Sequence, residues 1–253
     1  MAHKLQPANE FGGRFLQTTT DDKSLRDQAS VEELIRLFSV LSHDLKSPIF
    51  SIDGFSELLL SDYKDRLDDD GRDFLQRVRS SAQQMKRVLD EMSHVIKLLS
   101  RPNAQRPVNL RELAEEIRLK YNYLIEGGGV TVDIPEDLPT VNADPEKLRE
   151  ALSALISNAL IFTDQEKGDR KVTVEHSREG ANHRICVIDN GIGIDPRYAG
   201  QIFEIGMKLD KSRGEGPGYG LYLAKRVIES HGGKLTIESG PDQGSRFCFT
   251  LPA

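Results

Sequence analysis

Apolar side chains recur at alternating steps of four and three residues along the N-terminal third of the chain. The first stretch keeps this spacing for almost four repeats between residues 31 and 60, at Leu34, Phe38, Leu41, Leu45, Pro48, Ile52, Phe55 and Leu59. The second keeps it without a gap, at Leu75, Val78, Ala82, Met85, Leu89, Met92, Ile96 and Leu99. Such heptads are typical of helices that pack along one apolar seam. We therefore expect two helices whose seam residues are all core.

The segment between the two seams predicts a turn. Residues 61–73 are polar and acidic, and Asp69, Asp70 and Gly71 suit a turn followed by a helix start. The pattern therefore predicts a helical hairpin. One hairpin covers its seams poorly, whereas two hairpins side by side form a four-helix bundle that buries all four seams. We expect a homodimer.

Aperiodic segments divide the rest of the chain. We expect residues 1–29 to be a tail or linker remnant. Residues 101–107 contain two prolines, and we expect them to link a hairpin domain (30–100) to a second domain (108–253). The second domain mixes helix and strand patterns. The helix candidates are 111–125, 144–162 (opened by Asp144 and Pro145) and 219–231, and the strand candidates are 130–134, 171–177, 183–189, 234–239 and 245–251. This predicts a multi-domain protein, an α hairpin followed by an α/β layered domain.

Composition narrows the classes of function. Lys and Arg number 34 against 40 Asp and Glu, a net charge of −6 without a basic stripe, which argues against nucleic acid as the main partner. No run approaches the ~18 apolar residues of a membrane span. The N-terminus lacks the features of a signal peptide, so we expect a cytoplasmic chain without membrane contact. Cys186 and Cys248 match no metal spacing, and we expect both to be reduced core residues.

His43 is the first candidate for chemistry. It falls at heptad position f, the outermost position of its helix, so we expect an exposed ring. Asp44 follows directly and can hold one ring nitrogen as N–H, which leaves the other free as a nucleophile. Pro48 removes a helical hydrogen bond near Asp44 and can loosen the helix there. Taken alone, His43 also fits a surface histidine without a function.

A second candidate site follows a predicted strand. In VIDNGIGI, residues 187–194, the strand ends at Asp189 and the chain then turns through Gly191 and Gly193. An aspartate there can accept a hydrogen bond from an exocyclic amine, and the glycines let the backbone approach a flat ring. A plain Asn-Gly turn is the alternative.

A glycine-rich loop precedes the last predicted helix. It leads to a helix N-terminus whose free N–H groups suit an anion, and it fits neither a P-loop nor a Rossmann fingerprint. Its glycines are Gly214, Gly216, Gly218 and Gly220, and its cations, which can face phosphates, are Lys208, Lys211 and Arg213. A flexible surface loop is the alternative. Upstream, the amide of Asn158 lies late in a predicted helix, where it can serve Mg²⁺ or a phosphate oxygen.

In this order and spacing, the motifs resemble the kinase core of the two-component sensor histidine kinases over about residues 31–253. The matching segments are HDLKSP at 43–48 (H box), ALISNA at 154–159 (N box), DNGIGI at 189–194 (first glycine box), IFEIGMKLDKSR at 202–213 (F box and lid) and GPGYGL at 216–221 (second glycine box). The H box and the C-terminal segments HGGKLTIES and GSRFCFTLP are most similar to the kinase modules of phytochrome-type sensors.

The resemblance implies a dimerisation and histidine-phosphotransfer bundle followed by a Bergerat-type (GHKL) ATP-binding α/β sandwich. It implies that His43 accepts the γ-phosphoryl group of ATP, with Asp44 as acid/base partner, and passes it to an aspartate of a response regulator receiver domain. By the same resemblance Asn158 holds Mg²⁺ and Asp189 binds the adenine amine. The residues that shape the pocket and lid are Gly191, Gly193, Gly216, Gly218 and Gly220.

The chain departs from the family pattern at several positions. Ala154 stands where the kinases usually have an asparagine and where the related ATPases have a base glutamate, which argues against an ATPase without histidine transfer. The other departures are Ser47, Ile161, Ile205, Gly206 and Pro217. The alternative function is a degenerate kinase that acts as a dimeric nucleotide-binding scaffold.

Overall fold

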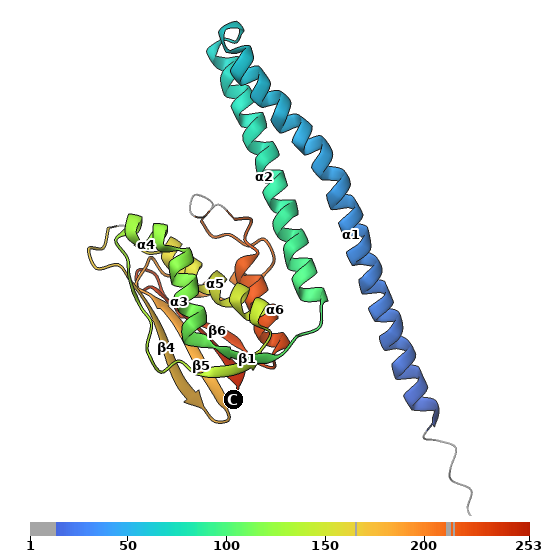
Figure 1. Cartoon of the computed structure of the whole chain (residues 1–253), viewed down its shortest axis with the longest axis vertical. Coiled ribbons are helices and arrows are strands. Elements are labelled where there is room, and N and C mark those ends of the chain that lie inside the picture. Colours follow the sequence, from blue (N-terminus) through green and yellow to red (C-terminus); the bar gives the residue numbers. More distant parts are fainter. Residues whose placement is uncertain (1–13, 165, 211–213, 215) are drawn as a thin grey trace, which may run out of the picture. The chain divides into compact units, whose positions relative to one another are not determined.

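Two long helices joined by a short turn form the N-terminal part of the protein (Figure 1). The computed structural model describes residues 14–164, 166–210, 214 and 216–253, with side chains from residue 33 onward. Helix α1 spans Arg14–Asp62, the short 3-10 helix η1 spans Lys64–Arg66, and α2 spans Asp69–Ser100. The hairpin is confirmed. Residues 14–30 of the expected tail or linker remnant belong to this helix, and they contain neither Gly nor Pro, which would interrupt it.

Polar side chains fix the turn and the pairing of the two helices beside it. Asp68 Oδ1 accepts the N–H of Gly71 at 2.8 Å, which caps the start of α2. Further along, Arg79 of α2 pairs with Asp53 and Glu57 of α1, at 3.1 and 2.8 Å. These contacts set the register of the hairpin near its turn.

The heptad seam of α1 is not the stripe that α1 buries. The buried side chains are Ser42, Ile49 and Ser56, each seven residues from the next, which places them on one stripe beside the seam. The seam residues exposed in the single chain are Leu34, Leu41, Leu45, Pro48, Ile52, Phe55 and Leu59. Helix α1 therefore carries two stripes and buries the other one within a single chain. The expectation that every seam residue is core refers to a bundle of two hairpins, and it stays a prediction. None of the described helices combines the length and the apolar content needed to cross a membrane.

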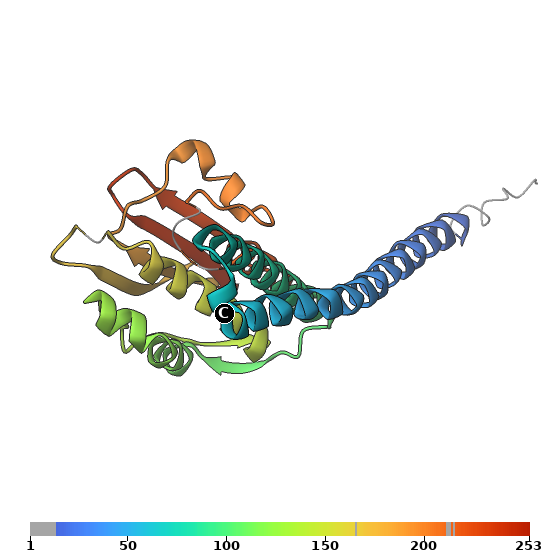
Figure 2. The same cartoon turned by 90° about the horizontal axis from the view of Figure 1, so that it is seen from above.

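A five-stranded sheet with helices packed on one face forms the C-terminal part (Figure 2). Its strand order is β2-β4-β5-β7-β6, antiparallel except for the parallel pair β2 and β4. The strands are β2 (Thr131–Asp133), β4 (Lys171–Glu179), β5 (Asn182–Asp189), β6 (Leu235–Ser239) and β7 (Ser245–Pro252). The helices are α3 (Leu110–Lys120), α4 (Asn122–Gly128), α5 (Pro145–Ile161), η2 (Pro196–Tyr198), η3 (Gln201–Phe203) and α6 (Gly220–Ser230). The predicted α/β layered domain is confirmed.

Side chains of the central strands point alternately to the two faces of the sheet, and those on the helix side form the core of this domain. Val187 of β5 and Phe247 and Phe249 of β7 are fully buried, in one apolar cluster with Leu155 of α5 and Val227 of α6. A separate two-stranded antiparallel sheet, β1 (Arg106–Asn109) with β3 (Thr140–Ala143), was not expected from the sequence. The packed layers hold the end of β5 and the last turns of α5 in fixed positions.

A buried polar cluster anchors the start of α5 to the residues before β1. Asp144 caps the helix by accepting the N–H of Lys147 at 3.1 Å, as the sequence predicts, and it also accepts the N–H of Ala104 at 2.9 Å. Lys147 is only 2% exposed, and its Nζ donates to Arg101 O at 2.6 Å and to Asn103 Oδ1 at 2.7 Å. The ammonium is therefore well satisfied inside the fold.

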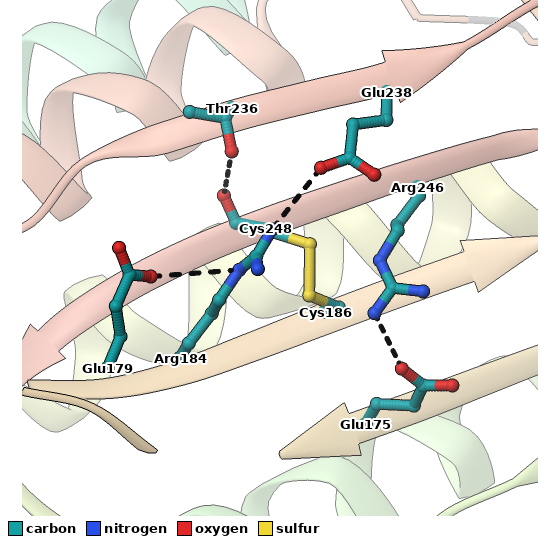
Figure 3. The surroundings of a disulfide bond; sticks show 8 residues. All are labelled: Glu175, Glu179, Arg184, Cys186, Thr236, Glu238, Arg246 and Cys248. Carbon is teal, nitrogen blue, oxygen red and sulfur yellow. Dashed lines mark hydrogen bonds and ion pairs between the residues drawn. A yellow bond between two sulfur atoms is a disulfide. The ribbon is translucent and has the colours of Figure 1, made fainter. Parts of the chain in front are cut away.

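The two cysteines form a disulfide, so the expectation of reduced thiols is wrong (Figure 3). Cys186 of β5 lies directly opposite Cys248 of β7 in the antiparallel register, with the Cα atoms 4.0 Å apart. Their separation of 62 positions in the sequence conceals this pairing. Both side chains lie on the sheet face away from the helices, between the ion pairs Arg184–Glu238 and Arg246–Glu175.

Candidate functional site

A cavity in the C-terminal domain brings together several of the residues that the sequence singled out. Asn158 near the end of α5, Gly193 after β5 and Lys208 before the glycine-rich loop all line it. The glycines of that loop that also line it are Gly214, Gly216, Gly218 and Gly220. Lys211 and Arg213 lie outside the described residues. Residues from three separate predicted motifs therefore line the same cavity.

Asp189 and Gly191 lie behind the wall of this cavity rather than on it. Gly191 N–H and Ser245 N–H both donate to Asp189 Oδ1, at 2.9 and 3.2 Å, and Ser245 itself lines the cavity. Among the described residues, Asp189 Oδ2 accepts no hydrogen bond. The second oxygen therefore keeps its capacity to accept a hydrogen bond.

Burial dominates the electrostatics of Asp189. The carboxyl is 4% exposed, and this burial raises its pKa to about 6, against the hydrogen bonds from Gly191 and Ser245 and the charge of Lys167, which lower the pKa. An ionised carboxylate held in so dry a site is a strong acceptor for an amine. The end of β5 therefore carries a hydrogen-bond acceptor, Asp189, whose pKa is set by burial and by its neighbours.

The glycines beside Asp189 are required by close backbone contacts. A Cβ on Gly191 would lie 2.1 Å from the carbonyl oxygen of Phe162, and a Cβ on Gly193, whose φ is +68°, would lie 1.9 Å from Gly240 O. Any side chain at either position would displace a neighbouring loop. The alternative of a plain Asn-Gly turn does not account for this packing.

Part of the cavity wall is suited to a negatively charged ligand. Helix α6 begins at Gly220, and its first N–H groups have no partner within the helix. Lys208 is held in the preceding segment, where its Nζ donates to Gly214 O at 2.9 Å. A helix N-terminus and an ammonium on one cavity are the groups that bind phosphates.

His43 and Asp44 form an exposed pair on α1. Their side chains are 88% and 69% exposed, and His43 Nδ1 lies 3.2 Å from Asp44 Oδ1. With the proton on Nδ1, the ring donates to Asp44 and leaves Nε2 open to solvent. Helix α1 continues through Pro48 without ending. The predicted exposure and pairing of His43 are confirmed.

The sequence pattern did not indicate that Ser245 and Lys167 belong to this site. Ser245 orients Asp189 across the β5–β7 pair, and Lys167 contacts the turn that follows Asp189. Ser245 begins a strand 56 residues further along the chain, and Lys167 is one charged residue in a polar loop. Only the sheet register and the loop packing bring them to Asp189.

Comparisons with known proteins agree with this geometry. The family described as "Histidine kinase-, DNA gyrase B-, and HSP90-like ATPase" matches residues 143–253, and the "His Kinase A (phospho-acceptor) domain" matches residues 33–99. Cyanobacterial phytochrome B of Nostoc is 32% identical over 227 residues, which are 88% of this chain and 30% of that protein. The adaptive-response sensory kinase SasA of Crocosphaera subtropica is 31% identical over 244 residues, 92% of this chain and 62% of that protein.

Solved structures show the same architecture. Full-length ShkA in complex with AMPPNP superposes with a TM-score of 0.63 at 25% identity, over 86% of this chain and 45% of that one. The catalytic domain of the histidine kinase ThkA matches in fold with a TM-score of 0.51, over 58% of this chain. The chain spans about 30% of the length of its phytochrome relatives. The ordered motifs, the helical hairpin, the sandwich and these matches together identify the chain as the two-domain core of a two-component sensor histidine kinase.

Proposed function

We propose that this chain is an ATP-dependent protein-histidine kinase that autophosphorylates His43 and passes the phosphoryl group to an aspartate of a response regulator receiver domain. One observation carries the proposal. A single chain holds an exposed His43–Asp44 pair in its phospho-acceptor domain and, in its ATPase-like domain, a cavity with a helix N-terminus on its wall and the buried acceptor Asp189 behind that wall. The relative ShkA is described with AMPPNP, an ATP analogue, which supports a nucleotide as the ligand.

The cavity accommodates the two ends of ATP with different groups. Asp189 Oδ2 would accept a hydrogen bond from the exocyclic amine of adenine, while the N-terminus of α6 and Lys208 would face the phosphates. The Asn158 amide fits Mg²⁺ as a single protein ligand, because this ion usually takes its remaining ligands from phosphates and water. When bound, Mg²⁺ would neutralise charge on the phosphates. The described residues contain no cluster of three or more His, Cys, Asp or Glu that could hold a metal alone.

Transfer requires a nucleophilic nitrogen on His43. Asp44 would keep the proton on Nδ1, so that the lone pair of Nε2 attacks the γ-phosphorus. The N–P bond forms as the bond from the γ-phosphorus to the bridging oxygen breaks, and ADP leaves. Asp44 would then stabilise the imidazolium. In the second step the aspartate of the receiver attacks the phosphorus and the N–P bond breaks.

The exposed seam of α1 supports a homodimer as the working unit. Leu41, Leu45, Ile52 and Phe55 are each at least 41% exposed in the single chain and lie along one face. A second copy would cover these side chains in a four-helix bundle, which removes apolar surface from water. The same pairing would leave position f, and therefore His43, on the outside.

Labelling with [γ-³²P]ATP and Mg²⁺ tests the proposal. The wild-type protein should acquire acid-labile, alkali-stable label, His43→Gln should acquire none, and His94→Gln, a control at position f of the other helix, should label normally. His43→Gln should still bind ATP and dimerise, because its exposed ring packs against nothing that the dimer needs. Label retained in His43→Gln would refute the assignment.

Two other outcomes would favour other functions. ATP binding and dimerisation without any label in the wild-type protein would indicate a nucleotide-binding scaffold, which Ala154 on the cavity wall supports. Steady ATP hydrolysis that survives in His43→Gln would indicate an ATPase without histidine transfer.

A further inference from the structure

Lys167 ties together two loops beside the candidate nucleotide site. It lies between α5 and β4, and its Nζ donates to three backbone carbonyl oxygens: Asn190 at 2.8 Å, Asp242 at 3.2 Å and Gly191 at 3.5 Å. An ammonium has three N–H donors, so all three are engaged. The motifs that define the kinase core do not include Lys167.

The two loops that Lys167 joins both lead to Asp189: one follows it in the chain, and the other leads into Ser245, whose N–H donates to Asp189 Oδ1. Asn190 and Gly191 follow Asp189 directly, and the N–H of Gly191 donates to its Oδ1. Asp242 lies in the turn between β6 and β7, and its N–H donates to Ile192 O at 2.8 Å. The glycine turn after β5 is therefore held against the β6–β7 turn both by a backbone hydrogen bond and by the ammonium.

Lys167 also contributes charge at this point. Burial raises the pKa of Asp189, and the positive charge of Lys167 acts against that rise. Among the described residues, Lys167 is the charged group whose charge lowers the pKa of Asp189. The ammonium of Lys167 is thus placed to act on Asp189.

We infer that Lys167 is a positioning residue for nucleotide binding: it clamps the glycine turn after β5 to the β6–β7 turn and so keeps Asp189 Oδ2 directed at the adenine amine. The inference rests on the proposed function, in which Asp189 is the adenine ligand. Because Lys167 acts through Asp189 and not on the reacting phosphorus, its loss should raise KM for ATP and leave kcat nearly unchanged.

Three variants of the full chain separate charge, hydrogen bonding and general stability. Lys167→Met removes the charge and every donor, Lys167→Arg keeps the charge, and Lys234→Gln removes an exposed charge at the opposite end of β6 as a control. The carboxyl carbon of Asp189 is followed by NMR against pH in the nucleotide-free protein. AMPPNP affinity is then measured by calorimetry between pH 5.5 and 8.

We expect Asp189 to titrate at a higher pH in Lys167→Met than in the wild-type protein, and near the wild-type value in Lys167→Arg and Lys234→Gln. AMPPNP should bind Lys167→Met roughly tenfold more weakly at pH 7. An unchanged Asp189 titration in Lys167→Met would overturn the inference, as would equal losses of affinity in Lys167→Met and Lys234→Gln. If the wild-type protein bound no AMPPNP, the proposed function would fail, and the nucleotide-free titration would still decide the role of Lys167.

Discussion

Replacing Asp189 with Asn should stabilise the protein and at the same time weaken nucleotide binding. The carboxyl is almost fully buried, and its pKa rises from the usual 3.8 to about 6 in the fold. At pH 7.5 the group is ionised in both the folded and the unfolded chain, so the fold carries the cost of burying the charge. A rise of this size corresponds to about 3 kcal/mol of folding free energy at pH 7.5.

The amide should avoid that cost while keeping the local hydrogen bonds. Both N–H donors, from Gly191 and Ser245, bind the same oxygen of Asp189, so the amide oxygen of the Asp189→Asn side chain would accept both. Its NH₂ group would then point where the adenine amine should bind, and two donors would face each other. The lost charge-assisted hydrogen bond is worth roughly 1.5 to 3 kcal/mol, or one to two decades in affinity.

The sign of the pH dependence distinguishes this explanation from ordinary repacking. A carboxyl with a raised pKa destabilises the fold progressively as pH rises from 3.8 through 6, because the native state binds the proton more tightly. Asp189→Asn should therefore gain about 3 kcal/mol at pH 7.5 but only about 1 kcal/mol at pH 4.5.

Urea denaturation without nucleotide at the two pH values measures the gain, and calorimetry with AMPPNP measures the affinity. Asp137→Asn, at an exposed aspartate in a loop before β3, is the control and should change neither quantity. A variant less stable than the wild-type protein at pH 7.5, or a gain that is the same at both pH values, would refute the reasoning. Unchanged AMPPNP affinity would remove Asp189 from the site.

Two further predictions concern the phospho-acceptor helix and the disulfide. Phe50 is 73% exposed and lies two turns from His43 on the same helix face, so Phe50→Ala should slow transfer to the cognate receiver more than autophosphorylation in single-turnover assays. Equal loss of both rates would point to a contact with the catalytic domain, and no loss would leave Phe50 as a surface residue. Reduction of Cys186–Cys248, which joins residues 62 positions apart in the sequence, should lower the free energy of unfolding by roughly 4 kcal/mol in guanidinium titrations. The Cys186→Ser/Cys248→Ser protein should not respond to reductant, and a reduced wild-type protein as stable as the oxidised one would contradict the estimate.

Features encoded by neighbouring residues were predictable from the sequence. The heptad spacing predicts the hairpin, and Asp144 followed by Pro145 predicts the start of α5, because a helix cap needs only the next few N–H groups. Position f on the helix predicts the exposure of His43 in the same way. The glycines at 191 and 193 mark the turn after β5, although the sequence does not reveal which carbonyls they approach.

Contacts between distant parts of the chain were decided only by the tertiary structure. Cys186 meets Cys248, and Ser245 meets Asp189, because β5 and β7 pair in one particular antiparallel register. A shift of one residue would turn each of these side chains to the other face of the sheet. Lys167 reaches Asn190 and Asp242 only after three loops have packed together. The sequence by itself therefore determined the helical hairpin, the start of α5 and the order of the motifs, since these depend on local spacing. The disulfide, the buried setting of Asp189 and the Lys167 clamp depend instead on strand register and loop packing.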